Sequence, residues 1–117
     1  MGLHGEPGVR RGSLMPAHEV TRFLIDNIVR DLRLEPDAEA AVLVNGAGAT
    51  PLSELYIVFR SVAALLEEAG ILVANSYVRN YATSLDMAGC SVTLMPLNAD
   101  LKHWIDAPCQ SAALVQA

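Results

Sequence analysis

The residues best suited to chemistry lie in the first eight positions, Met-Gly-Leu-His-Gly-Glu-Pro-Gly. His4 stands among Gly2, Gly5 and Gly8, which can adopt positive φ and let a backbone or a small ligand approach closely, and Pro7 fixes its own φ. Such a loop can hold an imidazole ring in a set direction. A solvated turn near a chain start has the same composition, so these residues alone leave both interpretations open.

A second candidate is the glycine-rich turn at residues 45–51, which follows the apolar run at residues 40–44. A strand, a glycine turn and a helix N-terminus together form the geometry that binds anions. No Lys follows the glycines as in a Walker motif, and the dinucleotide fingerprint is incomplete. Tight packing of strand against helix is therefore the alternative interpretation.

The other reactive side chains form no recognised site. The pair Arg10-Arg11 can meet a phosphate or an acidic partner, or simply be solvated. His18 and His103 are expected at the surface. Cys90 and Cys109 have no metal-binding spacing with the histidines, and we expect both to be reduced, Cys90 buried and Cys109 exposed in the tail.

Composition limits the classes of protein. The chain has 117 residues, 52% of them hydrophobic and 18% charged, with a mean hydropathy of +0.32, which predicts one folded domain over residues 1–117. A net charge of −5 argues against nucleic acid as a partner. No apolar run approaches the roughly 20 residues that span a bilayer, and the N-terminus lacks the apolar core of a signal peptide. We therefore expect no membrane association and a cytoplasmic location.

Hydrophobic periodicity and turn residues predict six elements. They are helices at residues 16–35, 51–69 and around 101–105, and strands at 40–44, 71–78 and 90–94. The unbroken apolar run at 40–44 is typical of a central parallel strand whose two faces are both covered by helices. The connection to 90–94 is too short for a parallel crossover, so this strand should run antiparallel to 71–78.

Several single residues support these boundaries. Thr50 is expected to cap the helix that Pro51 starts, and Gly70 to end it in a left-handed conformation. Pro96 indicates a sheet edge or a strand end. The fold class is thus α/β, a small mixed β-sheet covered by helices. If residues 2–4 end a further parallel strand, His4 and the turn at 46–50 share one rim at the carboxyl ends of the strands.

Three long stretches resemble, in order and spacing, the substrate-binding K domain of dihydroxyacetone (glycerone) kinases. They read GLHGEPGVRR at 2–11, VLVNGAGATPLSELY at 42–56 and YATSLDMAG at 81–89, and the segment 97–108 is similar to that family's end. The resemblance covers essentially the whole chain, but only the carboxyl-terminal part of the family's K domain.

The resemblance implies that His4 binds a ketone covalently through its imidazole, as a hemiaminal, with Gly2 and Gly5 in the same substrate site. A neutral imidazole nitrogen is a nucleophile that adds to a carbonyl group. Glycerol has no carbonyl group, so a site that binds its substrate in this way rejects glycerol. Dihydroxyacetone is then held with a terminal hydroxyl aimed at a phosphoryl donor.

The implied partners lie outside this chain. The donor is either ATP on a nucleotide-binding domain or ADP on an L subunit recharged by a phosphotransferase-system protein, each with magnesium, and this sequence itself has no cofactor site. The family's other substrate and acid/base residues, a His and an Asp, belong to the amino-terminal half of the K domain, so we do not expect this chain alone to be a competent kinase. The resemblance and an exposed sheet edge also suggest a homodimer.

Two departures from the family pattern are Arg79, where relatives commonly carry Gly, and Pro96, where a Lys is common. At these two positions, the packing or dimer contacts implied by the family pattern are therefore in doubt. Two other functions stay open: a non-catalytic protein that senses dihydroxyacetone for regulation, and an inactive truncated remnant.

Overall fold

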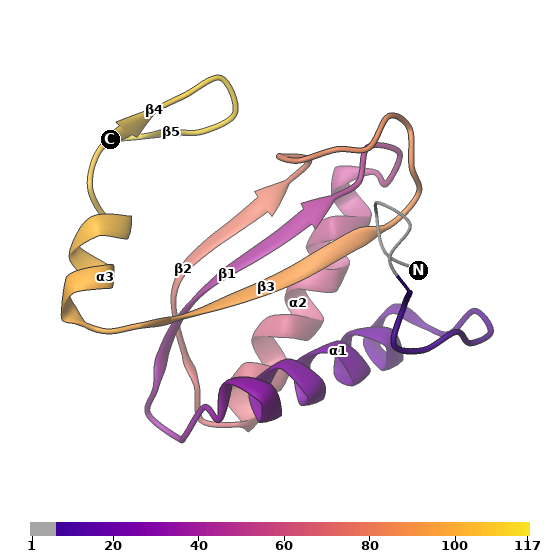
Figure 1. Ribbon diagram of the computed structural model, residues 1–117, viewed down its shortest axis with the longest axis horizontal. Helices are drawn as coiled ribbons and strands as arrows, with labels where there is room; N and C mark the ends of the chain where they lie inside the picture. The colour runs from indigo at the N-terminus through magenta and orange to yellow at the C-terminus, as the bar shows by residue number, and fades with distance from the viewer. Residues whose placement is uncertain (1–6) are drawn as a thin grey trace.

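The computed structural model describes residues 7–117, and Figure 1 shows a sheet with long helices packed against one of its faces. The elements are α1 (Ala17–Leu32), β1 (Glu39–Gly46), α2 (Leu52–Glu68), β2 (Leu72–Arg79), β3 (Cys90–Leu97), α3 (Ala99–Ile105), β4 (Cys109–Gln110) and β5 (Val115–Gln116). All six elements expected from the sequence within these residues are confirmed. Over the same residues, no helix is both long and apolar enough to cross a membrane.

The sheet is mixed and has the order β2-β1-β3. β1 is the central strand and pairs with β2 in parallel and with β3 in antiparallel orientation. The predicted central parallel strand and the reversed direction of the last strand are both confirmed. The fold is therefore α/β with a small mixed sheet.

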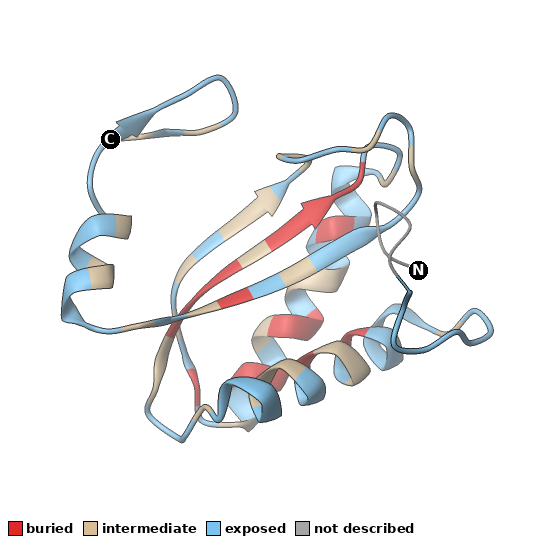
Figure 2. Ribbon diagram, viewed as in Figure 1, coloured by how far each residue is buried: buried red, intermediate tan, exposed pale blue. Residues whose placement is uncertain are grey.

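Helices α1 and α2 pack together against one face of this sheet and enclose the core (Figure 1). Figure 2 shows that buried residues concentrate along β1 and on the sides of the two helices that meet it. The core residues are Ile25, Ala40, Val42, Val44, Leu55, Val62, Leu65, Leu66, Ile71 and Leu94. Helices were expected on both faces of β1, but α1 and α2 share one face, and among the described residues the other face has only the short helix α3 near one end of the sheet.

The helix ends follow local sequence signals in most places. Gly70 adopts φ +74° after α2, and its N–H bonds to the Glu67 carbonyl, so the predicted glycine stop is confirmed. The side chain of Asn98 accepts the Leu101 N–H at 2.8 Å and caps α3. At the start of α2, however, Pro51 occupies the N-cap position and no side chain caps the helix, so the capping role predicted for Thr50 is wrong.

The carboxyl-terminal residues form a small hairpin, β4–β5, which the sequence did not predict. One tie to the sheet is the Tyr77 hydroxyl, which donates a hydrogen bond to the Gln116 side chain at 3.1 Å. Burial raises the pKa of Tyr77, and nearby Cys109 and Asp106 add to this effect. The hydroxyl is therefore held in its neutral, donating form.

Substitution of Val42 by Ala tests where the stability of the sheet resides. Val42 is fully buried in the centre of β1, so Val42→Ala should lower the free energy of unfolding by about 2 kcal/mol through lost burial and a residual cavity. Val9→Ala is the matched control, because Val9 is fully exposed, and it should change stability by less than about 0.5 kcal/mol. Urea denaturation measures both, and equal effects would contradict this account of the core.

Candidate functional site

The residues assigned to the ligand by sequence, His4 with Gly2 and Gly5, lie outside the described residues. The strand end expected at residues 2–4 lies there too. The described residues begin at Pro7, inside the motif, and residues 7–16 connect the end of the motif to α1. The site is therefore built from the segments that adjoin this motif.

The segment after Pro7 is held against α1 by Arg10. The Arg10 guanidinium lies over the Phe23 ring, 5.0 Å from its centroid, which is a cation–π contact. Together, the segment, α1 and β3 line an open groove of about 670 Å³. Asn27 and Asp31 from α1 are polar groups on its wall. Of the pair Arg10-Arg11, Arg10 thus has a packing partner.

The groove also places this segment relative to the sheet. Gly8 and Val92 both line it, and Val92 pairs with Val44, two residues before β1 ends at Gly46. The chain that continues from the motif therefore runs beside the first half of β3, close to the carboxyl end of β1. The rim that His4 was expected to share with the turn 46–50 stays a prediction, because His4 lies outside the described residues.

At the carboxyl end of β1, the turn 46–50 is joined to the connection 83–89 by backbone hydrogen bonds. The Ala47 N–H donates to the Gly89 carbonyl at 2.9 Å, and the Ala49 N–H donates to the Met87 carbonyl at 3.0 Å. Thr50 completes this contact, because its hydroxyl donates to the Gly89 carbonyl and accepts the Gly89 N–H, each at 2.9 Å. Thr50 therefore ties two loops together instead of capping α2.

The two glycines of this turn allow that close approach. A Cβ at Gly46 would lie 2.1 Å from the Asn80 side-chain oxygen, and one at Gly48, which has φ +136°, would lie 2.2 Å from the Leu85 carbonyl oxygen. No larger residue fits either place without a shift of its neighbours. The turn thus packs tightly against Asn80 and the connection 83–89, whereas the sequence left open tight packing of strand against helix or anion binding.

Asn45 is the residue that sequence reasoning missed. Its side chain is buried, and its oxygen accepts the N–H groups of Tyr81 and Ala82 at 2.9 and 2.8 Å. Its amide nitrogen donates to the Ala82 carbonyl at 2.8 Å. This amide connects the end of β1 to the chain just after β2. A polar residue at the end of an apolar strand was the signal that could have identified it.

The remaining candidates are not gathered into a site. His18 and His103 are exposed, as expected. Cys109 is exposed as expected, but the prediction of a buried Cys90 is wrong. Cys90 begins the edge strand β3 opposite Gly46, which has no side chain to cover it. In residues 7–117, no three His, Cys, Asp or Glu side chains are placed to hold a metal ion.

Ser84 and Asp86, in the connection 83–89, have side chains of the type that caps helices, but no helix begins between them and β3. Ser84 contributes through its backbone instead, because its N–H donates to the Ala47 carbonyl at 2.8 Å. The connection is shaped by its contact with the turn 46–50.

Several kinases of ketoses are similar to this chain over nearly its whole length. It is 40% identical over 111 residues to the dihydroxyacetone-binding subunit DhaK of PTS-dependent dihydroxyacetone kinase 2 from Listeria innocua serovar 6a, which covers 95% of this chain and 34% of the relative. It is 37% identical to D-erythrulose kinase from Mycolicibacterium smegmatis, over 97% of this chain and 20% of the relative. The chain thus spans about a third or less of the length of these relatives.

Two solved structures share the fold. One, described as the regulation of the dha operon of Lactococcus lactis, superposes with a TM-score of 0.89 at 30% identity and covers 98% of this chain and 37% of that one. The other is the dihydroxyacetone kinase operon co-activator Dha-DhaQ, with a TM-score of 0.83 at 31% identity over 92% of this chain and 34% of that one.

The family assignment rests on a match to nearly the entire sequence. Residues 1–113 match the model of the Dak1 domain, and this range includes the HGEPG motif, the turn after β1 and the connection before β3. It agrees with the resemblance drawn from those three stretches. The chain belongs to the Dak1 domain family.

Proposed function

We propose that this chain supplies the dihydroxyacetone-binding part of a dihydroxyacetone kinase, with His4 as the covalent ligand of the ketone. The observation that carries the proposal is the Dak1 match across residues 1–113, which contains the HGEPG motif around His4. The DhaK subunit from Listeria innocua is described as dihydroxyacetone-binding. The groove beside Gly8 and Arg10 supports it, since an open space adjoins the segment that leads to the motif.

The chemistry of the proposed step is an addition. The unprotonated ring nitrogen of His4 attacks the carbonyl carbon of dihydroxyacetone, the carbon–oxygen π bond breaks, and the oxygen takes up a proton while the ring loses one. Nothing leaves, so the product is a hemiaminal that reverses to release the ketone. Because the step requires a carbonyl, a polyol such as glycerol is rejected.

Phosphoryl transfer to this bound ketone depends on groups beyond the chain. The family resemblance assigns the donor either to ATP on another domain or to ADP on an L subunit that a phosphotransferase-system protein recharges, each with magnesium. It assigns the acid/base His and Asp to the amino-terminal half of the K domain. Within the proposal, this chain fixes the acceptor hydroxyl in place, and positioning is the main contribution of a protein to phosphoryl transfer.

A second function is favoured by one specific observation. One of the two solved structures is that of an operon co-activator, Dha-DhaQ, so a Dak1 fold can serve in regulation. A sensor would bind the ketone without passing on a phosphoryl group. Supplying the chain with the rest of the Listeria innocua DhaK subunit, its L subunit, nucleotide and phosphotransferase proteins distinguishes the two: phosphorylated product supports the kinase, and hemiaminal without product supports the sensor.

The covalent ligand can be tested by NMR with dihydroxyacetone isotope-labelled at its carbonyl carbon. A hemiaminal converts this carbon from a carbonyl to a tetrahedral carbon and moves its resonance accordingly. The new resonance should appear with the unaltered chain and with His18→Asn, because His18 is exposed on α1, and should be lost in His4→Asn. Persistence of the resonance in His4→Asn would overturn the assignment, and labelled glycerol should give no new resonance with any variant.

The contact that holds residues 7–16 against α1 can be tested by substituting two neighbouring arginines, Arg10 and Arg11. A cation–π contact at an exposed site contributes about 0.5–1 kcal/mol, so Arg10→Ala should weaken ketone binding roughly two- to fivefold by loosening the segment that continues to His4. Arg11→Ala is the control, because it removes the same charge from the next position. Titration followed by NMR measures both affinities, and equal losses would show that the positive charge, not the Phe23 contact, matters.

A further inference from the structure

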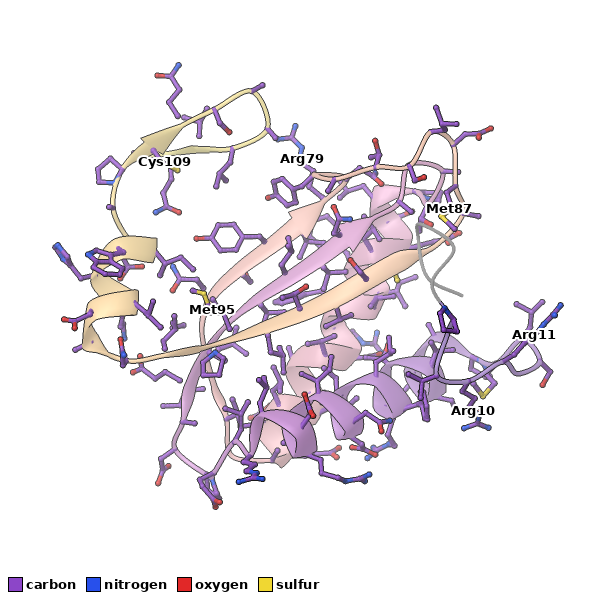
Figure 3. The ribbon with its side chains drawn as sticks, in the orientation of Figure 1. Arg10, Arg11, Arg79, Met87, Met95 and Cys109 are labelled. Atoms are coloured by element: carbon purple, nitrogen blue, oxygen red, sulfur yellow. The ribbon has the colours of Figure 1, made fainter. Side chains whose placement is uncertain are left out.

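The face of the sheet turned away from α1 and α2 is apolar along its centre. Leu43 of β1 lies between Tyr77 of β2 and Thr93 of β3, and Ala41 lies beside Met95 of β3. In Figure 3, Met95 projects from the sheet on the side where α3 lies. Neither long helix reaches this face, because both pack against the opposite face of the sheet. The face thus has the composition of a core without a complete layer over it.

Helix α3 and the β4–β5 hairpin form a wall along this face. Between the wall and the sheet lies an open cavity of about 470 Å³, and no charged residue lines it. Trp104 of α3 lines the cavity while 69% of it remains exposed. An exposed tryptophan beside an open apolar cavity is typical of an interaction surface.

Two polar side chains that line this cavity, Tyr77 and Gln116, are already paired. The Tyr77 hydroxyl donates to Gln116, and the Gln116 amide nitrogen donates to the carbonyls of Ile105 and Ala107 at 2.6 and 3.0 Å. They therefore offer little hydrogen bonding to a new ligand. The surface favours an occupant that buries apolar side chains over a charged or strongly polar one.

The length of the relatives indicates what that occupant is. This chain corresponds to 34% of the Listeria innocua subunit and to 37% of the Lactococcus lactis chain on which it superposes. Roughly two thirds of the Dak1-containing chains therefore lies outside the 117 residues. An apolar run on a central strand such as β1 is typical of a sheet covered on both faces, and here one cover is incomplete.

We propose that this surface, formed by Ala41, Leu43, Tyr77, Thr93, Met95 and Trp104, docks the part of the Dak1-containing subunit that these 117 residues do not include. The occupant is an apolar helix or loop of that part, which completes the second layer over the sheet. The inference builds on the proposed function, because the family resemblance places the acid/base His and Asp in that part. Docking itself requires no ligand.

The test is co-expression of this chain with the portion of the Listeria innocua DhaK subunit that does not align with it. We expect a one-to-one complex in native mass spectrometry, and hydrogen exchange should slow in β3 and α3 when the complex forms. Absence of any complex would overturn the docking proposal. It would leave the NMR test of His4 unaffected, so failures of the two proposals are distinguishable.

A matched pair of variants locates the interface. Trp104→Glu places a charge on the proposed surface and should weaken the complex at least about tenfold, as at an interface hot spot. Tyr56→Glu is the control, because Tyr56 is 54% exposed on α2, the helix that packs against the opposite face, and it should change affinity less than about twofold. Equal weakening by the two variants would overturn the assignment of the surface.

Two further measurements distinguish a loss of docking from a loss of folding. Circular dichroism and thermal melting should be alike for both variants and the unaltered chain, and Thr93→Lys, at an exposed position lining the same cavity, should repeat the loss if Trp104→Glu disturbs α3. If the chain alone is a dimer that Trp104→Glu dissociates, the occupant is a second copy and the proposal is wrong.

Discussion

The buried amide of Asn45 is the interaction on which the carboxyl end of the sheet depends. It makes three hydrogen bonds to the backbone of Tyr81 and Ala82, so the end of β1 and the start of the connection after β2 are fixed to each other. Leaving a buried donor or acceptor unpaired costs about 1–3 kcal/mol, which makes this arrangement hard to rearrange locally. The segments that follow β1 and β2 thus leave the sheet side by side. This allows Gly48 and Thr50 to contact residues 85–89.

Much of the fold could be predicted because its signals are local or periodic. The apolar run of β1 identified the central strand, and the glycine after α2 ended that helix because Gly70 adopts positive φ without strain. Pro96 indicated a sheet edge or a strand end, and within residues 7–117 β3 is an edge strand with Pro96 at its penultimate position. The β4–β5 hairpin gave no such signal, because each of its strands has two residues, too few for a period.

The candidate site was less predictable, because its contacts join residues that are distant in sequence. Thr50 is of a residue type that often caps helices, but its side chain bonds to Gly89, 39 residues later. No local sequence pattern indicates that pairing. Cys90 is in phase with the core residues of β3 and is still exposed. Burial at the end of a strand depends on the side chains of the neighbouring strand, and here the neighbour is Gly46. The role of His4 was drawn from the family resemblance, and its place remains a prediction.

Strand β3 links the two surfaces that this protein offers. Thr93 lines the groove beside Gly8 and Arg10 and also the apolar cavity in front of α3. As an edge strand, β3 has hydrogen bonds to β1 on one side and none to a further strand within residues 7–117, so packing on its two faces supplies much of its restraint. A layer docked on the apolar face would therefore fix the same strand against which the segment leading to His4 lies. The proposed docking layer and the groove beside Gly8 and Arg10 would thus share Thr93 of this one strand.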